Sequence, residues 1–235
     1  KNILQNAGIE LVETRVSQEH LAHFINENKI DVLLVRSATK VRKELIDACP
    51  QLKIIGRGGV GMDNIEVKYA QEKGIKVINT PNASSHSVAE LTFAHLFSGV
   101  RFLYDANRNM PLEGDTRFNE LKKDYANGHE LRGKTLGIIG LGRIGRAVAT
   151  IALGLGMKVI AYDPEQQEAT ITLSFFDGRS LDFVIKTISK KEVLEEADFI
   201  TLHIPAQKEA VIGEKEFQQM KDGVGIINVA RGGVI

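Results

Sequence analysis

The sequence predicts an α/β fold with two doubly wound parallel sheets, and three observations support this. Short apolar runs alternate with helical segments through roughly the first 82 residues. The same alternation returns after residue 133, where a glycine-rich turn separates the first strand from the first helix. Between them lies a long apolar helix that belongs to neither alternation. We therefore expect two domains, residues 1–85 and 86–235.

The first domain is expected to begin with a helix end and a strand at Ile9–Glu13. Ser17 can cap a helix that runs to about Asn28. Gly74 stands at a C-cap position, where its freedom to adopt a positive φ favours a helix end. The remaining strands are expected at Asp31–Arg36, Leu52–Gly56 and Lys76–Asn79, and the helices at Lys43–Ala48 and Asn64–Lys73.

The next segment differs in character. Ser87 and Glu90 have the spacing of a capping box and would open a helix that is apolar almost all round. Such a helix must be buried, either between domains or against a second copy, and we expect it in a two-fold homodimer interface. Residues 105–130 are polar and contain Pro111, so we expect them to be irregular.

The clearest functional signal lies between Lys134 and Asp163, which is expected to form strand, glycine turn, helix and strand. Gly140 permits the tight turn, Gly142 lets the backbone approach a pyrophosphate, and Gly145 lets the helix pack on the strand. The first N–H groups of that helix face the phosphates. Asp163 ends the second strand, where a carboxylate accepts both ribose hydroxyls of NAD and repels the extra phosphate of NADP. The alternative is a glycine-rich turn with no ligand.

A β-hairpin is expected after Asp163. Thr170–Phe176 and Leu181–Thr187 alternate apolar and polar residues around an Asp177-Gly178 turn. We interpret the hairpin as an insertion in the second domain. Beyond it we expect a helix at Ser189–Glu196, a strand at Phe199–His203, a helix at Lys215–Met220 and a strand at Gly225–Val229.

Three strand ends offer contacts to anions. Arg231 follows a strand, and ligands of doubly wound sheets lie at the carboxyl ends of strands. Arg36 also ends a strand, and the loop from Gly56 to Gly61 has four glycines whose N–H groups can form an anion nest. Together they would suit a small substrate with two negative groups. The alternatives are a solvated arginine at each strand end and a tight crossover in the loop.

Composition narrows the partners. Lys and Arg number 30, as do Asp and Glu, which argues against binding nucleic acid through bulk charge. We expect no membrane span, because no apolar run approaches 18 residues, and no metal site, because no cluster of ligands is apparent. One cysteine, Cys49, cannot form an intrachain disulfide and fits the cytoplasm, where we expect the protein.

Six motifs together resemble the D-isomer-specific 2-hydroxyacid dehydrogenase family over nearly the whole chain. They are VRSATKV (35–41), GRGGVGMDN (56–64), NTPNASS (79–85), GKTLGIIGLGRIG (133–145), DFITLHIP (198–205) and NVARGG (228–233). The resemblance implies a flavodoxin-like substrate domain, a Rossmann domain for NAD and hydride transfer from a 2-hydroxy acid. Within the family, the motifs favour a phosphorylated substrate. The alternatives are glyoxylate, hydroxypyruvate or lactate as substrate, or an NAD-sensing protein of the corepressor type.

The resemblance also implies roles for individual residues. Arg231 would be the catalytic arginine that binds the substrate carboxylate and carbonyl. The implied cofactor contacts are Val60, Gly140, Gly142, Arg143, Ile144, Gly145, Asp163, Ile204, Pro205, Val229 and Ala230. The implied substrate contacts are Arg36, Ser37, Gly58, Gly59 and Asn82. The family places a proton-transferring histidine and its glutamate beyond the ARGG motif, so we expect the 235-residue chain to bind NAD without turnover.

Overall fold

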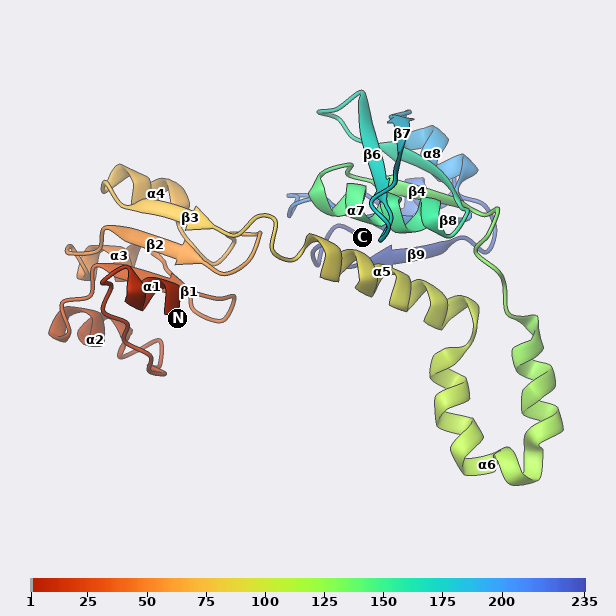
Figure 1. The fold of residues 1–235 in the computed structure, drawn as a ribbon, viewed down its shortest axis with the longest axis horizontal. Helices are drawn as coiled ribbons and strands as arrows, with labels where there is room; N and C mark the ends of the chain where they lie inside the picture. Colours follow the sequence, from red (N-terminus) through yellow and green to blue (C-terminus); the bar gives the residue numbers. More distant parts are fainter. Residues whose placement is uncertain (1) are drawn as a thin grey trace. The chain divides into compact units, whose positions relative to one another are not determined.

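The computed structural model describes residues 2–235; residue 1, part of the expected first helix end, lies outside them. The chain divides into two compact units, Lys1–Ala83 and Ser84–Ile235 (Figure 1). Both are built from parallel sheets and helices, which confirms the predicted α/β class. The roles assigned to the predicted domains, residues 1–85 and 86–235, stay predictions.

The first unit has a three-stranded parallel sheet in the order β1-β2-β3. Its strands are β1 (Val32–Val35), β2 (Ile54–Arg57) and β3 (Lys76–Asn79), and its helices are α1 (Asn2–Asn6), α2 (Leu21–Glu27), α3 (Lys43–Ala48) and α4 (Val67–Glu72). Val35, Arg57 and Asn79 are paired across the sheet, so the three strands end at one edge. A core that includes Ile25, Val41 and Ile55 lies between the sheet and its helices.

Three local predictions for this unit were wrong. Residues 9–13 are not a strand, because nothing pairs with their backbone in the described sheet. Ser17 does not cap α2, which begins at Leu21; its hydroxyl bonds the ring of His20 instead. The fourth helix begins at Val67, because Asn64 turns inward and donates to the carbonyls of Arg36 and Thr39 at 3.0 and 2.7 Å. Gly74 does end that helix, with φ of +78°.

The second unit has a four-stranded parallel sheet in the order β5-β4-β8-β9. Its strands are β4 (Thr135–Ile139), β5 (Lys158–Tyr162), β8 (Phe199–Leu202) and β9 (Gly225–Asn228). The helices that connect them are α7 (Arg143–Gly154), α8 (Lys190–Glu196) and α9 (Glu214–Phe217), and α8 begins with a capping box at Ser189. Every residue of β4 is buried. One core packs α7 on one side of the sheet, and another packs α8 on the other side.

The predicted hairpin is confirmed. β6 (Glu168–Ser174) and β7 (Ser180–Lys186) pair antiparallel, and Phe175 N–H donates to the Arg179 carbonyl next to the turn. The buried side chains of Ala169, Ile171 and Ile185 join the core around α7. The hairpin is therefore packed onto the nucleotide unit along one face.

Two predictions about the intervening helices were wrong. Helix α5 (Ser85–Val100) begins two residues before Ser87, so Ser87 and Glu90 lie inside it and form no capping box. Residues 103–124 are helical rather than irregular: they form α6 (Leu103–Asp124), which bends back on itself at Arg117 and ends in a short turn, η1 (Tyr125–Asn127) (Figure 1). Pro111 lies inside α6 without ending it.

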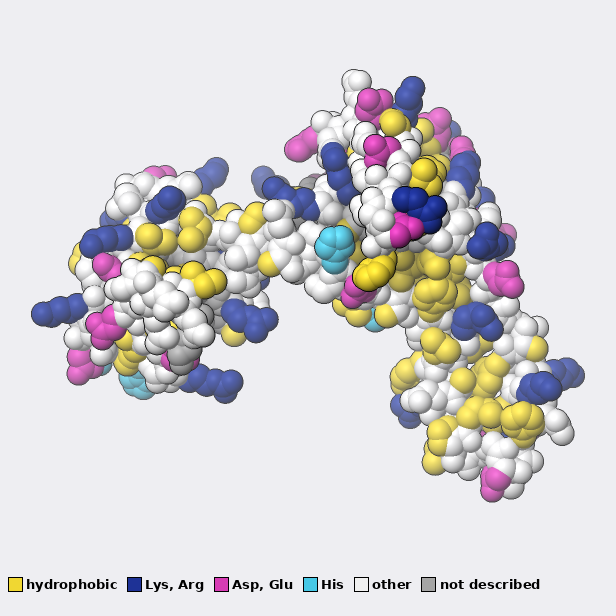
Figure 2. Space-filling model, in the orientation of Figure 1, with side chains coloured by type: hydrophobic (Ala, Val, Ile, Leu, Met, Phe, Trp, Pro, Cys, Tyr) yellow, Lys and Arg dark blue, Asp and Glu magenta, His cyan; other side chains and the backbone are white. Residues whose placement is uncertain are grey.

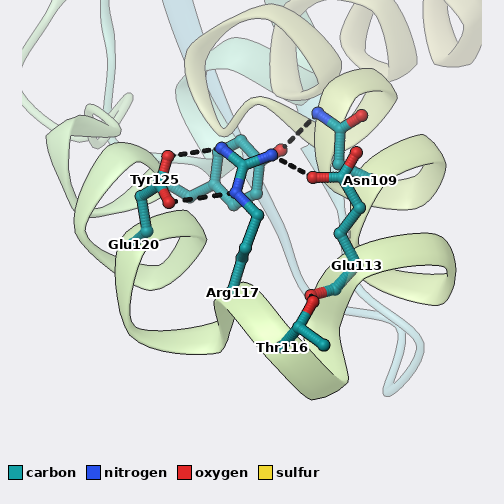
Figure 3. Close-up of polar contacts among 6 residues, drawn as sticks. All are labelled: Asn109, Glu113, Thr116, Arg117, Glu120 and Tyr125. Carbon is teal, nitrogen blue, oxygen red and sulfur yellow. Dashed lines mark hydrogen bonds and ion pairs between the residues drawn. The ribbon is translucent and has the colours of Figure 1, made fainter.

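Arg117 accounts for the bend in α6. Its φ and ψ of −119° and 21° are not helical, and its guanidinium bridges Glu113 in one arm and Glu120 in the other (Figure 3). Asn109 also donates to the Tyr125 hydroxyl at 3.0 Å, which joins the far ends of the two arms. Side-chain bonds therefore hold the two arms together where backbone helical bonds are interrupted. Among residues 2–235, no helix is both long and apolar enough to cross a membrane.

Candidate active site

The glycine turn between β4 and α7 has the shape that its sequence predicts. Gly140 has φ of +96°, and a Cβ there would lie 2.7 Å from the His203 carbonyl oxygen. A Cβ at Gly145 would overlap the carbonyl oxygen of Gly140. Both positions therefore exclude any side chain, and the turn is packed against the end of β8.

Gly142 differs from these two glycines. No atom lies within 4 Å of the position where its Cβ would be. Gly142 is also the N-cap of α7 and has no side chain with which to bond the first N–H groups of that helix. Open space beside a helix N-terminus is what a pyrophosphate needs, since the N–H groups and the helix dipole both favour an anion there.

Asp163 lies next to this turn, one residue after β5. Its Oδ2 accepts a hydrogen bond from the Leu141 N–H at 2.7 Å, and its Oδ1 accepts from the Glu165 N–H at 2.9 Å. The carboxylate is half-buried. An acid fixed beside the glycine turn is in the right place to accept ribose hydroxyls from a dinucleotide whose phosphates lie at α7.

The ends of β8 and β9 complete this edge of the sheet. Ile204 and Pro205 follow β8, where the His203 N–H donates to the Ile139 carbonyl at 2.8 Å. Val229, Ala230 and Arg231 follow β9. Because all four strands are parallel, these segments and the glycine turn share the carboxyl edge.

Asn228 shapes the turn that carries Arg231. Its side-chain oxygen accepts from the Ala230 N–H at 3.0 Å, and its amide donates to the Arg231 carbonyl at 2.9 Å. The Arg231 guanidinium donates to the Ala230 carbonyl at 2.8 Å and is half-buried. The Asn228 side chain therefore fixes the backbone of Ala230 and Arg231, from which the guanidinium extends.

His203 is the most strongly perturbed titratable group at this edge. Burial lowers the pKa of its imidazole to about 4, so the ring is neutral at pH 7. It shares a hydrogen bond of 3.0 Å with the Thr201 hydroxyl, and its Nδ1 is buried with no partner among the described residues. A neutral ring with so low a pKa is a weak base.

His203 should make the protein sensitive to acid. The unfolded imidazole binds a proton below about pH 6.5, whereas the folded one stays neutral until about pH 4. The contribution of His203 to the free energy of unfolding is therefore constant above about pH 6.5. It decreases by up to ~3 kcal/mol as the pH is lowered from about 6.5 to 4. Urea unfolding of the wild type and of His203→Gln across this range should show a shallower pH dependence in the variant. Equal slopes would exclude His203 as the group responsible.

In the first unit, the predicted substrate-binding residues also lie at one edge of the sheet. Arg36 and Ser37 follow β1 and are exposed, and Gly58 to Val60 follow β2. The Gly58 N–H donates to the Val35 carbonyl at 2.9 Å, which holds this loop beside the end of β1. Asn82 lies in the exposed turn after β3. Since β1, β2 and β3 end in register, the five predicted substrate contacts and Val60 share that edge.

Residues 93–235 match the family model described as "D-isomer specific 2-hydroxyacid dehydrogenase, NAD binding domain". The chain belongs to the D-isomer-specific 2-hydroxyacid dehydrogenase family. Its cofactor is NAD, and the open glycine turn with Asp163 beside it fits a dinucleotide.

Curated members of this dehydrogenase family match nearly the whole chain. Hydroxypyruvate reductase of Thermotoga maritima is 43% identical over 235 residues, covering 99% of this chain and 70% of the reductase. D-3-phosphoglycerate dehydrogenase of Methanocaldococcus jannaschii is 40% identical and also covers 99% of this chain. The chain spans only 42% of that second relative's length.

Solved dehydrogenase structures share the fold. NAD-bound 3-phosphoglycerate dehydrogenase of Entamoeba histolytica superposes with a TM-score of 0.74 at 31% identity, covering 100% of this chain and 67% of that one. An NAD-dependent formate dehydrogenase of Staphylococcus aureus in complex with NAD gives a TM-score of 0.77 at 26% identity and covers 66% of that chain. Both support the predicted Rossmann fold.

The structure brings most of the predicted dehydrogenase residues together within their own units, and their roles stay predictions. Two further residues contribute to the geometry and were not predicted as site residues: Asn228 and Gln166. Asn228 carried a usable signal, because asparagine after a strand often bonds the backbone of a turn. Gln166 had no recognisable signal in the sequence, because its contacts with Arg146 and Leu141 come from segments 20 and 25 residues away and its contact with Asp163 belongs to no known motif.

Proposed function

We propose that the protein oxidises 3-phospho-D-glycerate with NAD to 3-phosphooxypyruvate, the first step of the phosphorylated route to serine. The main support for this proposal is that the glycine turn, Asp163 and Arg231 all lie at the carboxyl edge of the β5-β4-β8-β9 sheet. The D-3-phosphoglycerate dehydrogenase relatives at about 40% identity support this substrate class. Arg36, exposed at the end of β1, supplies a cation for the phosphate.

In this proposal, each residue has a distinct task. Asp163 binds the adenosine ribose, and the N-terminus of α7 binds the pyrophosphate. Arg231 binds the substrate carboxylate through two parallel hydrogen bonds and polarises the carbon–oxygen bond at C2. NAD, when bound, accepts the hydride that leaves C2. The hydroxyl proton needs a separate acceptor, and the low pKa of His203 makes that ring a poor one at neutral pH.

A second candidate is the reduction of hydroxypyruvate, and the 43% identity to a hydroxypyruvate reductase favours it. 3-Phosphoglycerate is a 2-hydroxy acid and hydroxypyruvate a 2-oxo acid, and at C3 the first carries a phosphate and the second a neutral hydroxyl. A cation opposite C3 should therefore matter for 3-phosphoglycerate and have little effect on hydroxypyruvate.

The test is a substrate panel with the full-length protein. The panel consists of 3-phosphoglycerate, glycerate and lactate with NAD, and of the corresponding 2-oxo acids with NADH. We expect the highest kcat/KM for 3-phosphoglycerate with NAD. Arg36→Ala should lower kcat/KM for 3-phosphoglycerate about 10- to 100-fold, as expected when a charged partner is lost, and leave hydroxypyruvate nearly unchanged. The control is Lys40→Ala, another exposed cation on the same loop. Hydroxypyruvate as the best substrate would select the second candidate, and NAD binding without turnover of any acid would select a corepressor-type role.

The predicted homodimer forms part of the proposal. Leu91 and Phe97 of α5 remain 48% and 37% exposed, and α6 exposes Leu103, Leu112 and Phe118. Figure 2 shows hydrophobic side chains gathered over α6 and the adjoining end of α5. An apolar surface on two adjacent helices is typical of an interface between identical subunits.

Light scattering at low micromolar concentration should give twice the mass of one full-length chain. Leu91→Glu combined with Phe97→Glu should give a monomer, because each change would place a carboxylate in the apolar interface. Phe176→Glu is the matched control, since Phe176 is fully exposed at the hairpin turn and outside α5. A monomeric wild type would contradict the proposed interface.

A further inference from the structure

A chain of side-chain contacts joins Asp163 to the base of the β6–β7 hairpin. The Gln166 amide nitrogen lies 3.4 Å from Asp163 Oδ2 and 3.4 Å from the Leu141 carbonyl oxygen. The Gln166 amide oxygen accepts from the Arg146 guanidinium. Arg146 also donates through Nε to the Leu141 carbonyl at 3.2 Å. Gln166 therefore lies between the carboxylate and the guanidinium and contacts both.

The neighbours of Gln166 determine the orientation of its amide. Both groups near its nitrogen are acceptors, and the group at its oxygen is a donor that has no lone pair to offer. Turning the amide over would place oxygen against oxygen and nitrogen against nitrogen. Gln166 is thus suited to this position in a way that neither a glutamate nor a lysine is.

The backbone of Gln166 is also fixed. The Thr187 hydroxyl donates to its carbonyl at 2.8 Å and to the Gln167 carbonyl at 3.0 Å. Next to Thr187, the Ile188 N–H donates to the Ala161 carbonyl of β5 at 2.9 Å. The start of β6 is thereby tied to the end of β7 and to β5. The hairpin thus holds Gln166 at the end of β5, beside Asp163.

We propose that Gln166 is a positioning residue that sets the preference for NAD over NADP. Its amide nitrogen holds the Asp163 carboxylate in place for the ribose hydroxyls, and its amide oxygen holds Arg146 away from them. An arginine near the ribose accommodates the 2′-phosphate of NADP in folds of this type, so a released Arg146 would favour the wrong cofactor. The inference rests on the proposed role of Asp163, and it gives the inserted hairpin a function in cofactor choice.

Calorimetric titration of the full-length protein with NAD and with NADP tests this role. Gln166→Ala should lower the affinity for NAD about 3- to 10-fold, the effect expected for one lost hydrogen bond, and should raise the affinity for NADP. The ratio of the NAD affinity to the NADP affinity should therefore fall at least about 10-fold. The matched control is Gln167→Ala, because the described contacts of Gln167 are made by its backbone. That variant should leave both affinities unchanged.

A second variant separates the two contacts of Gln166. Gln166→Glu keeps an oxygen for Arg146 but places a second carboxylate beside Asp163. The affinity for NAD should therefore fall, and the affinity for NADP should not rise. In the background of Asp163→Ala, Gln166→Ala should weaken NAD no further, because the group it positions is gone.

Two outcomes would overturn different claims. If Gln166→Ala and Gln167→Ala give the same NAD-to-NADP ratio while Asp163→Ala weakens NAD, the role of Gln166 is wrong and the proposed cofactor site stands. If Asp163→Ala leaves NAD affinity unchanged, the proposed cofactor site itself is wrong. Should Gln166→Ala fail to fold, the loss of NAD affinity in Gln166→Glu without a gain in NADP decides the question.

Discussion

Arg231→Lys in the full-length protein is expected to lower kcat/KM for its 2-hydroxy acid about 10²- to 10³-fold. Lysine keeps the charge but is a compact ammonium, so it cannot make the two parallel hydrogen bonds that a carboxylate accepts from a guanidinium. Removing a donor that stabilises charge at the reacting carbon has effects of this size. Steady-state kinetics, together with calorimetric titration of NAD, would measure it.

The control for this prediction is Arg179→Lys. Arg179 is exposed in the hairpin turn, where it pairs with Asp177. Arg179→Lys should leave both kcat/KM and NAD affinity unchanged, whereas Arg231→Lys should lower kcat/KM and leave NAD affinity unchanged. If Arg231→Lys retained full activity, another cation would have to bind the carboxylate, and the proposed role of Arg231 would be wrong.

Gly145→Ala is expected to abolish measurable NAD binding and to lower the free energy of unfolding by about 1–3 kcal/mol. Its Cβ would overlap the Gly140 carbonyl oxygen and lie 3.3 Å from Ile138 Cγ2. Gly140 is held in place by its N–H, which donates to the Tyr162 carbonyl at 2.9 Å. The glycine turn would therefore have to open, and urea unfolding with calorimetric titration would detect both effects.

The matched control is Gly154→Ala in the same helix. No atom lies within 4 Å of a Cβ at Gly154, the last residue of α7. Alanine there should raise the free energy of unfolding by about 0.5–1 kcal/mol, because the unfolded chain loses freedom. Similar effects from the two substitutions would mean that overlap with the Gly140 carbonyl does not determine the outcome.

The parts of the fold that the sequence predicts correctly are those with strong local signals. Gly140 and Gly145 have no room for a side chain, and Gly142 leaves open space at the start of the helix, so their spacing predicts the turn and the helix that follows it. The hairpin has two alternating strands and an Asp177-Gly178 turn within about 20 residues, so local pairing determines its register.

Predictions fail where distant contacts outweigh local preference. Residues 103–124 are polar and contain a proline, yet Arg117 binds both arms of α6 and Asn109 bonds Tyr125, and neither contact can be inferred from periodicity. Residues 9–13 have a strand-like pattern, but no strand within residues 2–235 pairs with them. At the candidate site, Gln166 becomes meaningful only once Leu141, Arg146 and Asp163 are placed around it.

The position of β4 determines how the cofactor turn will exchange its amide hydrogens with solvent. β4 is buried at all five residues and is paired on one side with β5 and on the other with β8. Its amides should exchange only through global unfolding, whereas those of α6, of which only Leu121 is buried, should exchange through local opening. The glycine turn continues directly from β4, so it begins at the slowest-exchanging strand of its unit. The cofactor turn should therefore keep its shape while the arms of α6 open and close.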